Sequence, residues 1–240
     1  MKKQLIILLL LISLLSCNSK EKQLANIQVE YKGALKNMMH KGDISAKAKL
    51  SDFENIKHFY ALGASENLKG EIQILNSKPY NTSVIDSSLI FDNSYEKNAT
   101  LLVYATVNKW NSFKIPDEIK TYEQLENFIN LTAKANKINT NEPFPFLIEG
   151  KPKYVDWHVI NWKDGDIEHS HIKHINSGLN GRLYNKAVNM LGFYSNSHHA
   201  IFTHHTTNMH MHLVTADKDI AGHVDDINLN NGMVLKLPSI

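Results

Sequence analysis

The 240-residue sequence contains a single cysteine, Cys17, so no disulfide can form within the chain. It also lacks an excess of charge of either sign, since 26 lysines and arginines stand against 24 aspartates and glutamates, a net charge of +2. No long run of like charges, no low-complexity tract and no internal repeat is visible. We therefore expect no nucleic-acid partner, because such a partner is bound by a basic surface.

Long apolar runs are scarce too. The one at the amino terminus, Leu5 to Leu15, is too short to span a bilayer, which takes about 20 apolar residues. It follows a short basic start and leads into Leu14-Leu15-Ser16-Cys17, which resembles a bacterial lipoprotein signal. We predict that residues 1–17 are the signal segment with Cys17 lipidated, and that residues 18–26 are a polar tether. The protein would then be exported and held to a membrane on its periplasmic or cell-surface side. The alternative is an uncleaved anchor helix with an incidental cysteine.

About 220 residues remain, enough for one large or two small domains. Thr121 and Gln124 have the capping-box spacing that opens a helix, and residues 49–58 have the apolar spacing of a surface helix. Strand-like segments outnumber helical ones, which favours an α+β fold. We divide it into a sheet-plus-helix half, residues 27–138, and a β-rich metal-binding half, residues 139–240. The strands expected include residues 27–31, 71–74, 99–107, 144–148 and 153–160, the last two as a hairpin around Glu149-Gly150.

Eleven of the thirteen histidines lie in the second half of the chain, and three of these fall in one predicted hairpin. Residues 209–214 alternate as a strand, so His210 and His212 share a face. The polar segment 217–219 indicates the turn. If the turn is centred between Asp217 and Lys218, paired residue numbers sum to 435 and His223 lies opposite His212. Cross-strand Cβ atoms are roughly 4.5–5.5 Å apart, so the three imidazoles are predicted to converge.

Three converging histidines are a ligand set for a divalent metal that keeps one position free, as in catalytic zinc sites. We therefore predict a metal at His210, His212 and His223, with Zn²⁺ as the first choice and iron, nickel, copper or manganese as alternatives. The competing interpretation is that these are ordinary half-buried strand histidines.

The remaining histidines have less regular spacing. His169 and His171 fit one strand face, His174 does not, and we interpret this cluster as solvated, with a second metal site as the alternative. His204 and His205 are adjacent, so on a strand only one of them could face a pocket. We expect them to be loop residues near the site.

Several motifs resemble the acetolactate decarboxylase family. Leu62-Gly63, followed by Leu68 and Gly70-Glu71, resembles a segment of that family, and His210-Met211-His212 with Gly222-His223-Val224 resembles its metal motif. Gly192-Phe193 resembles a dipeptide just upstream. The motifs occur in the family's order, and the resemblance covers about Gln28 to Val224.

The resemblance implies a function and a two-part fold. The implied fold is a sheet with helices followed by a β-barrel-like half that carries the metal. The reaction would be metal-dependent decarboxylation of 2-acetolactate, a small 2-hydroxy-3-oxo acid, to acetoin and CO₂, in an enzyme that forms homodimers. Glu71, which composition alone would place in solvent at a strand end, would be the proton donor.

The sequence also departs from the family pattern. His158 stands where the family has an arginine that faces the substrate carboxylate, and we predict it as a second catalytic residue. Ala64 replaces a family threonine, and the family's carboxy-terminal glutamate has no counterpart before Ile240. Two other functions therefore stay open. One is a metal-dependent lyase or isomerase acting on another small oxygenated substrate. The other is a non-catalytic metal-binding lipoprotein whose fourth metal position is closed by His204 or His205.

Overall fold

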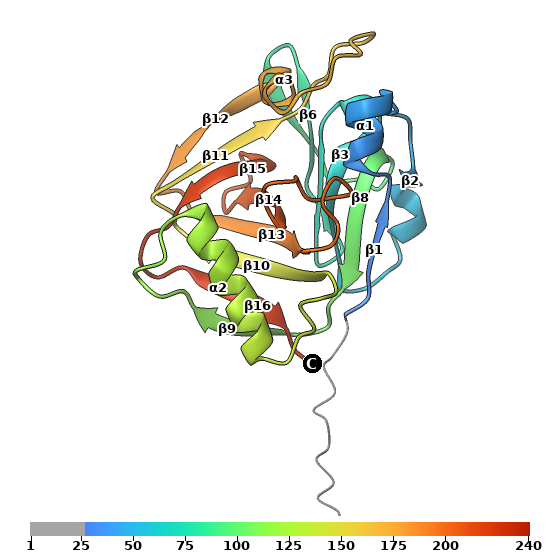
Figure 1. Ribbon diagram of the computed structural model, residues 1–240. Coiled ribbons are helices and arrows are strands. Elements are labelled where there is room, and N and C mark those ends of the chain that lie inside the picture. Colours follow the sequence, from blue (N-terminus) through green and yellow to red (C-terminus); the bar gives the residue numbers. More distant parts are fainter. Residues whose placement is uncertain (1–26) are drawn as a thin grey trace, which may run out of the picture.

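The computed structural model describes residues 27–240. The predicted signal segment, the tether and Cys17 lie outside the described residues. None of the helices in residues 27–240 is long and apolar enough to cross a membrane. What the structure describes is two antiparallel sheets and a few helices (Figure 1).

The first sheet is built from the amino-terminal part of the described chain. Its strands are β1 (Val29–Lys32), β2 (Ala48–Lys49), β3 (Phe59–Ser65), β4 (Glu71–Leu75), β5 (Lys78–Pro79), β6 (Asn81–Ile85), β7 (Ser88–Asp92) and β8 (Asn98–Thr106). The main order is β1-β8-β3-β4-β6-β7, with β2 beside β8 and β5 beside β4. The sheet is therefore centred on β3, β4 and β8.

The second sheet holds the rest of the strands. They are β9 (Trp110–Lys114), β10 (Phe144–Gly150), β11 (Tyr154–Val159), β12 (Leu179–Tyr184), β13 (Val188–Tyr194), β14 (Met209–Thr215), β15 (Ala221–Asn228) and β16 (Val234–Pro238). Their order is β12-β11-β15-β14-β13-β10-β16-β9. The α+β class is confirmed, but this sheet is open, with β12 and β9 at its two edges, rather than closed into a barrel.

Helices occupy the periphery. They are α1 (Leu35–Lys41), α2 (Tyr122–Ala135), α3 (His171–Asn176) and the short 3₁₀ helices η1 (Leu50–Phe53) and η2 (Glu66–Leu68). The predicted capping box is confirmed, since the Gln124 amide donates to the Thr121 hydroxyl and the Gln124 side chain accepts from the Thr121 amide. The expected surface helix over residues 49–58 is limited to η1.

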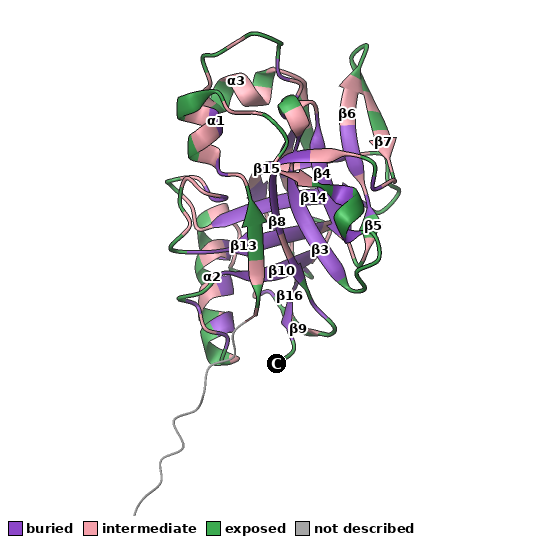
Figure 2. Cartoon of the chain, turned by 90° about the vertical axis from the view of Figure 1, so that its right-hand side faces the viewer, coloured by how far each residue is buried: buried purple, intermediate pink, exposed green. Residues whose placement is uncertain are grey.

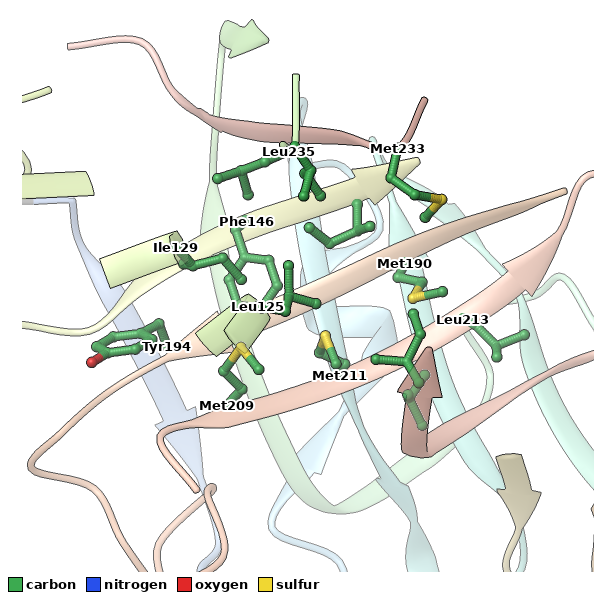
Figure 3. Packing of buried hydrophobic residues seen from close by; sticks show 14 of the residues in the cluster. Leu125, Ile129, Phe146, Met190, Tyr194, Met209, Met211, Leu213, Met233 and Leu235 are labelled. Carbon is green, nitrogen blue, oxygen red and sulfur yellow. The ribbon is translucent and has the colours of Figure 1, made fainter. Parts of the chain in front are cut away.

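The two sheets pack face to face, and three apolar clusters result. One lies between the sheets, where Leu62 and Val103 of the first meet Leu191 and Phe193 of the second. A second fills the space between the second sheet and α2, as Figure 3 shows. The third covers the other face of the first sheet under η1. Figure 2 shows the buried residues concentrated along the strands, with the helices mostly at intermediate or exposed positions. Side chains that point between the sheets are therefore shielded from water.

Two connections differ from the expectation. The predicted hairpin around Glu149-Gly150 is wrong, because β10 pairs with β13 and β16 whereas β11 pairs with β12 and β15. The chain passes from the first sheet to the second between Thr106 and Trp110, and α2 also packs on the second sheet. The domain division at residue 138 itself stays a prediction.

Candidate metal centre

The predicted histidine hairpin is present as β14 and β15. His212 lies opposite His223, so the expected register is confirmed. On the other side of β14, His210 and His212 lie opposite Phe193 and Leu191 of β13, and those two residues belong to the cluster between the sheets. Because strand residues alternate, the histidines share this inner face.

The three imidazoles converge. Their potential ligand atoms all lie within 4.8 Å of one another, and the Nε2 atoms of His210 and His212 are 3.2 Å apart. Two nitrogens bound to one tetrahedral zinc ion at 2.0–2.1 Å would be roughly 3.3 Å apart. The donor set and the spacing therefore fit a divalent cation.

The protonation of these histidines also fits a cation. Burial lowers the pKa of His210 to about 3, helped by the neighbouring His204. Burial and the adjacent imidazoles hold the pKa values of His212 and His223 well below the usual range. All three side chains are therefore neutral at physiological pH and present free lone pairs, as metal binding requires.

Glu71 approaches the histidines from the opposite sheet. It opens β4 and pairs with Ala64 of β3, on the face turned toward the second sheet. Its side chain is only 7% exposed, which excludes the competing interpretation of Glu71 as a solvated strand-end carboxylate. One carboxylate oxygen lies 3.7 Å from His212 Nε2, and the other accepts a hydrogen bond from the Ile160 amide at 3.2 Å.

The environment of Glu71 favours the neutral acid. Burial raises its pKa to about 7, and the charge of Asp225 acts in the same direction. The charge of His158 and the Ile160 amide oppose the rise. A carboxyl group that titrates close to neutral pH can act as a proton donor or acceptor.

His158 faces the same space. It lies on β11 directly opposite His223, with the two ring centroids 4.9 Å apart. Its Nδ1 is 2.9 Å from both carboxylate oxygens of Asp225, and its Nε2 is 4.0 Å from the nearer oxygen of Glu71. Burial works against its protonation, but Asp225 and Glu71 outweigh that and raise its pKa.

A cavity of about 60 Å³ lies over these groups. Its polar wall is formed by one carboxyl group and six histidines, namely Glu71, His158, His171, His174, His204, His210 and His223. It adjoins a larger cavity of about 690 Å³, and both are lined by His204 and His223. The two cavities are therefore adjacent. The apolar part of the smaller wall consists of residues such as Met38, Leu68, Leu101, Ile160 and Phe202.

The second histidine cluster lies at a helix and not on a strand, with His171 exposed and His169 and His174 partly buried. His171 and His174 belong to α3 and line the smaller cavity, and His169 lies just before the helix with Nδ1 3.0 Å from Nε2 of His174. Burial lowers the pKa of His174 to about 3. Over residues 27–240, only the hairpin histidines form a group of three or more potential metal ligands, so the alternative of a second metal site finds no support here.

The loop histidines also bear on the fourth metal position. His204 lines both cavities and lies 4.7 Å from the ring of His171, but 6.3 Å from that of His223. His205 lines only the larger cavity. Neither belongs to the converging group. The arrangement therefore leaves one side of the group facing the cavity.

Comparisons with known proteins agree with this geometry. The family model for alpha-acetolactate decarboxylase matches residues 31–237. The alpha-acetolactate decarboxylase of Bacillus subtilis strain 168 superposes with a TM-score of 0.70 at 14% identity, over 90% of this chain and 86% of that one. A Staphylococcus aureus protein of unknown function, described as similar to alpha-acetolactate decarboxylase, gives a TM-score of 0.67 at 13% identity, over 88% and 85% of the two chains. A search by sequence among proteins with curated descriptions finds no match. The family model covers most of the sequence, and the chain belongs to the alpha-acetolactate decarboxylase family.

Proposed function

We propose that this protein is a metal-dependent decarboxylase that converts 2-acetolactate to acetoin and CO₂. Family membership supports the reaction class. The observation that carries the proposal is the placement of Glu71, which reaches from one sheet to within 3.7 Å of a histidine of the other. A proton donor and a ligand set for a cation therefore face one small cavity.

The cation we propose is divalent, with Zn²⁺ as the first choice, held by His210, His212 and His223. When bound, such an ion stabilises negative charge that develops on oxygen atoms of the substrate. The inner face of the hairpin supplies the neutral nitrogens, and the outer face of the same strand packs under α2. The fold thus fixes the ligands on a rigid element.

In the reaction, the bond between the carboxylate carbon and C2 breaks and CO₂ leaves. The electron pair of that bond passes into the adjacent ketone. A new C–H bond then forms with the proton of the Glu71 carboxyl, which balances the step. Burial raises the pKa of this carboxyl to about 7, so a large fraction of it carries the proton to be delivered at neutral pH.

The other cavity residues position the substrate. His158 presents Nε2 toward the space beside Glu71, within reach of a substrate oxygen. Leu68 and Leu101 provide an apolar wall, which suits the two methyl groups of acetolactate. Water is kept from the reacting carbon by the same packing.

The test is turnover by the purified protein loaded with Zn²⁺. Incubation with 2-acetolactate should release equal amounts of acetoin and CO₂. Glu71→Gln should keep the metal and lose the reaction, which separates a failed proton donor from a failed metal site. A wild-type protein that holds one metal ion and makes no acetoin would contradict the proposal, and a non-catalytic metal-binding role would then be favoured.

A second candidate is a metal-dependent lyase or isomerase acting on another small oxygenated substrate. One observation favours it: the described residues that line the smaller cavity include no lysine or arginine, and His158 faces that space instead. A histidine cannot offer the planar two-pronged cation that holds a carboxylate. Assays with neutral 2-hydroxyketones alongside 2-acetolactate would distinguish the two, because the isomerase would convert the neutral compounds without releasing CO₂.

We further propose that the protein is exported and anchored to a membrane through lipid on Cys17, and that it forms a homodimer. The lipoprotein-like segment at residues 14–17 supports the first part, and the family resemblance supports the second. Metabolic labelling with radioactive palmitate should mark the wild-type protein and leave Cys17→Ser unlabelled. Light scattering of the purified protein would give the mass of a dimer.

A further inference from the structure

The residue behind His158 occupies an unusual place in its strand. In the ladder between β11 and β15, Asp156 pairs with Asp226 and Trp157 pairs with Val224. Asp225 is thus an extra residue without a partner on β11, which defines a β-bulge. Bulges redirect a side chain and often adjoin functional sites. The extra residue of this bulge lies two positions after the predicted ligand His223.

The carboxylate of Asp225 contacts the ring of His158. Both oxygens of Asp225 lie 2.9 Å from His158 Nδ1, and the side chains of both residues are largely buried, at 13% and 7% exposure. A carboxylate only accepts, so Nδ1 carries the proton and donates it. That fixes both the tautomer and the rotation of the ring.

The opposite nitrogen of the ring is the one that faces the site. His158 Nε2 lies 4.0 Å from the nearest Glu71 oxygen, which is too far for a hydrogen bond. No hydrogen bond from Nε2 to another described residue occupies it. His158 also lines the small cavity together with Glu71 and His223. The nitrogen is thus aimed at a space between a proton donor and a metal ligand.

We propose that Asp225 is a positioning residue, which holds His158 so that its Nε2 engages an oxygen of the substrate. This inference rests on the proposed function, because it assigns the role to a reaction at the same cavity. Two-residue alternation keeps residue 225 on the face of His223. The bulge leaves Asp225 without a residue opposite it, and its carboxylate lies beside the ring of His158. Asp225 lines the larger cavity and not the smaller one that holds Glu71.

The kinetic test compares two adjacent aspartates. Asp225→Ala should lower kcat/KM by about 10²-fold, the lower end of what a positioned acid–base group contributes. Asp225→Asn should fall between this and wild type, because its amide oxygen still accepts from Nδ1. The matched control is Asp226→Ala, since Asp226 bonds the Tyr154 hydroxyl at 3.1 Å instead of His158. It should leave kcat/KM unchanged, and an equal loss in that control would overturn the proposal.

A double variant tests whether Asp225 acts through His158. In His158→Gln protein, adding Asp225→Ala should cause no further loss of kcat/KM, because the group being positioned is already absent. Losses that multiply would overturn the proposal. All variants should bind one metal ion per chain, and a loss of metal from Asp225→Ala alone would assign Asp225 to the metal site and count against this role.

A measurement without turnover separates this inference from the proposed function. Nitrogen-15 NMR of the zinc-loaded protein, with the His158 signals assigned by their absence in His158→Gln, should show the proton on Nδ1. Asp225→Ala should shift that proton toward Nε2 or mix the two tautomers. An unchanged spectrum would overturn the positioning role even in an active enzyme. The expected shift in a protein that makes no acetoin would retain the Asp225–His158 pairing and reject the decarboxylase.

Discussion

The two faces of β14 are both buried, but one carries apolar side chains and the other carries histidines. Met209, Met211 and Leu213 point to the cluster beneath α2 (Figure 3), whereas His210 and His212 point to the first sheet. One face gains stability from apolar contacts. The other buries polar rings whose charged forms are excluded. Burial alone therefore does not distinguish core residues from site residues. The face of β14 on which a side chain lies does distinguish them.

The comparison carries an energetic argument as well. A buried polar group costs free energy unless it is paired or bound, and the inner face of the hairpin holds several. The outer face offsets that cost by packing long side chains against a capped helix. Changes on the inner face should therefore affect metal and chemistry, and changes on the outer face should affect stability.

The largest effect is expected from removing a ligand on the inner face. His212→Ala leaves two histidines and should weaken binding of Zn²⁺ more than about 100-fold, since even residues that only support ligands are worth 10- to 100-fold. Metal analysis after dialysis and a competition titration would measure it. Circular dichroism should show the fold retained.

The matched control for that variant is His199→Ala, because His199 is exposed and its side chain is hydrogen-bonded to Asn208 rather than to a residue of the converging group. It should retain one metal ion per chain. Full metal content in His212→Ala would contradict the prediction that the inner face of the hairpin holds the metal.

The next largest effect concerns the group facing the hairpin. Glu71→Gln keeps the size of the side chain but removes the transferable proton, so kcat should fall about 10²- to 10⁴-fold. Metal content should not change, because Glu71 lies outside the converging nitrogens. Acetoin formation and metal analysis on the same samples would show the two results together. An active Glu71→Gln protein would leave the proton donor unidentified.

The sequence predicted those contacts of the site that join residues close together in the chain, and it did not predict the contacts between distant residues. The pairing of His212 with His223 depends on a turn and a two-residue period, both local, and it was confirmed. The contact of Glu71 with His212 joins residues 141 positions apart in different sheets. Local patterns say nothing about such a contact, and the family resemblance alone pointed to it.

Other parts were missed for a similar reason. Two-residue periodicity places Asp225 on the face of His223, but it cannot place the bulge that leaves Asp225 without a residue opposite it. The spacing of His169 and His171 fits one face of a strand, yet Ser170 caps a short helix there by accepting from the Lys173 amide. A serine before the helix was the available signal.

A smaller effect is expected on the outer face. Leu213→Ala removes a fully buried side chain and should lower the free energy of unfolding by about 2–5 kcal/mol. Urea denaturation of the metal-free protein would measure it. The zinc content of the folded variant should remain at one per chain. A loss of metal equal to that of His212→Ala would mean that the two faces are not separable.

The smallest effect should come from the helix that covers this face. Thr121→Ala removes the hydroxyl that accepts from the Gln124 amide and should cost about 1 kcal/mol, the usual value of such a cap. Thr121→Ser, which retains the hydroxyl, is the matched control and should lie close to wild type in the same denaturation experiment. Since α2 packs on the side of the sheet away from the histidines, zinc affinity should be equal in both variants and wild type. A cap variant that lost zinc affinity in proportion to its loss of stability would show that the outer face holds the ligands in place. The two faces would then be coupled rather than independent.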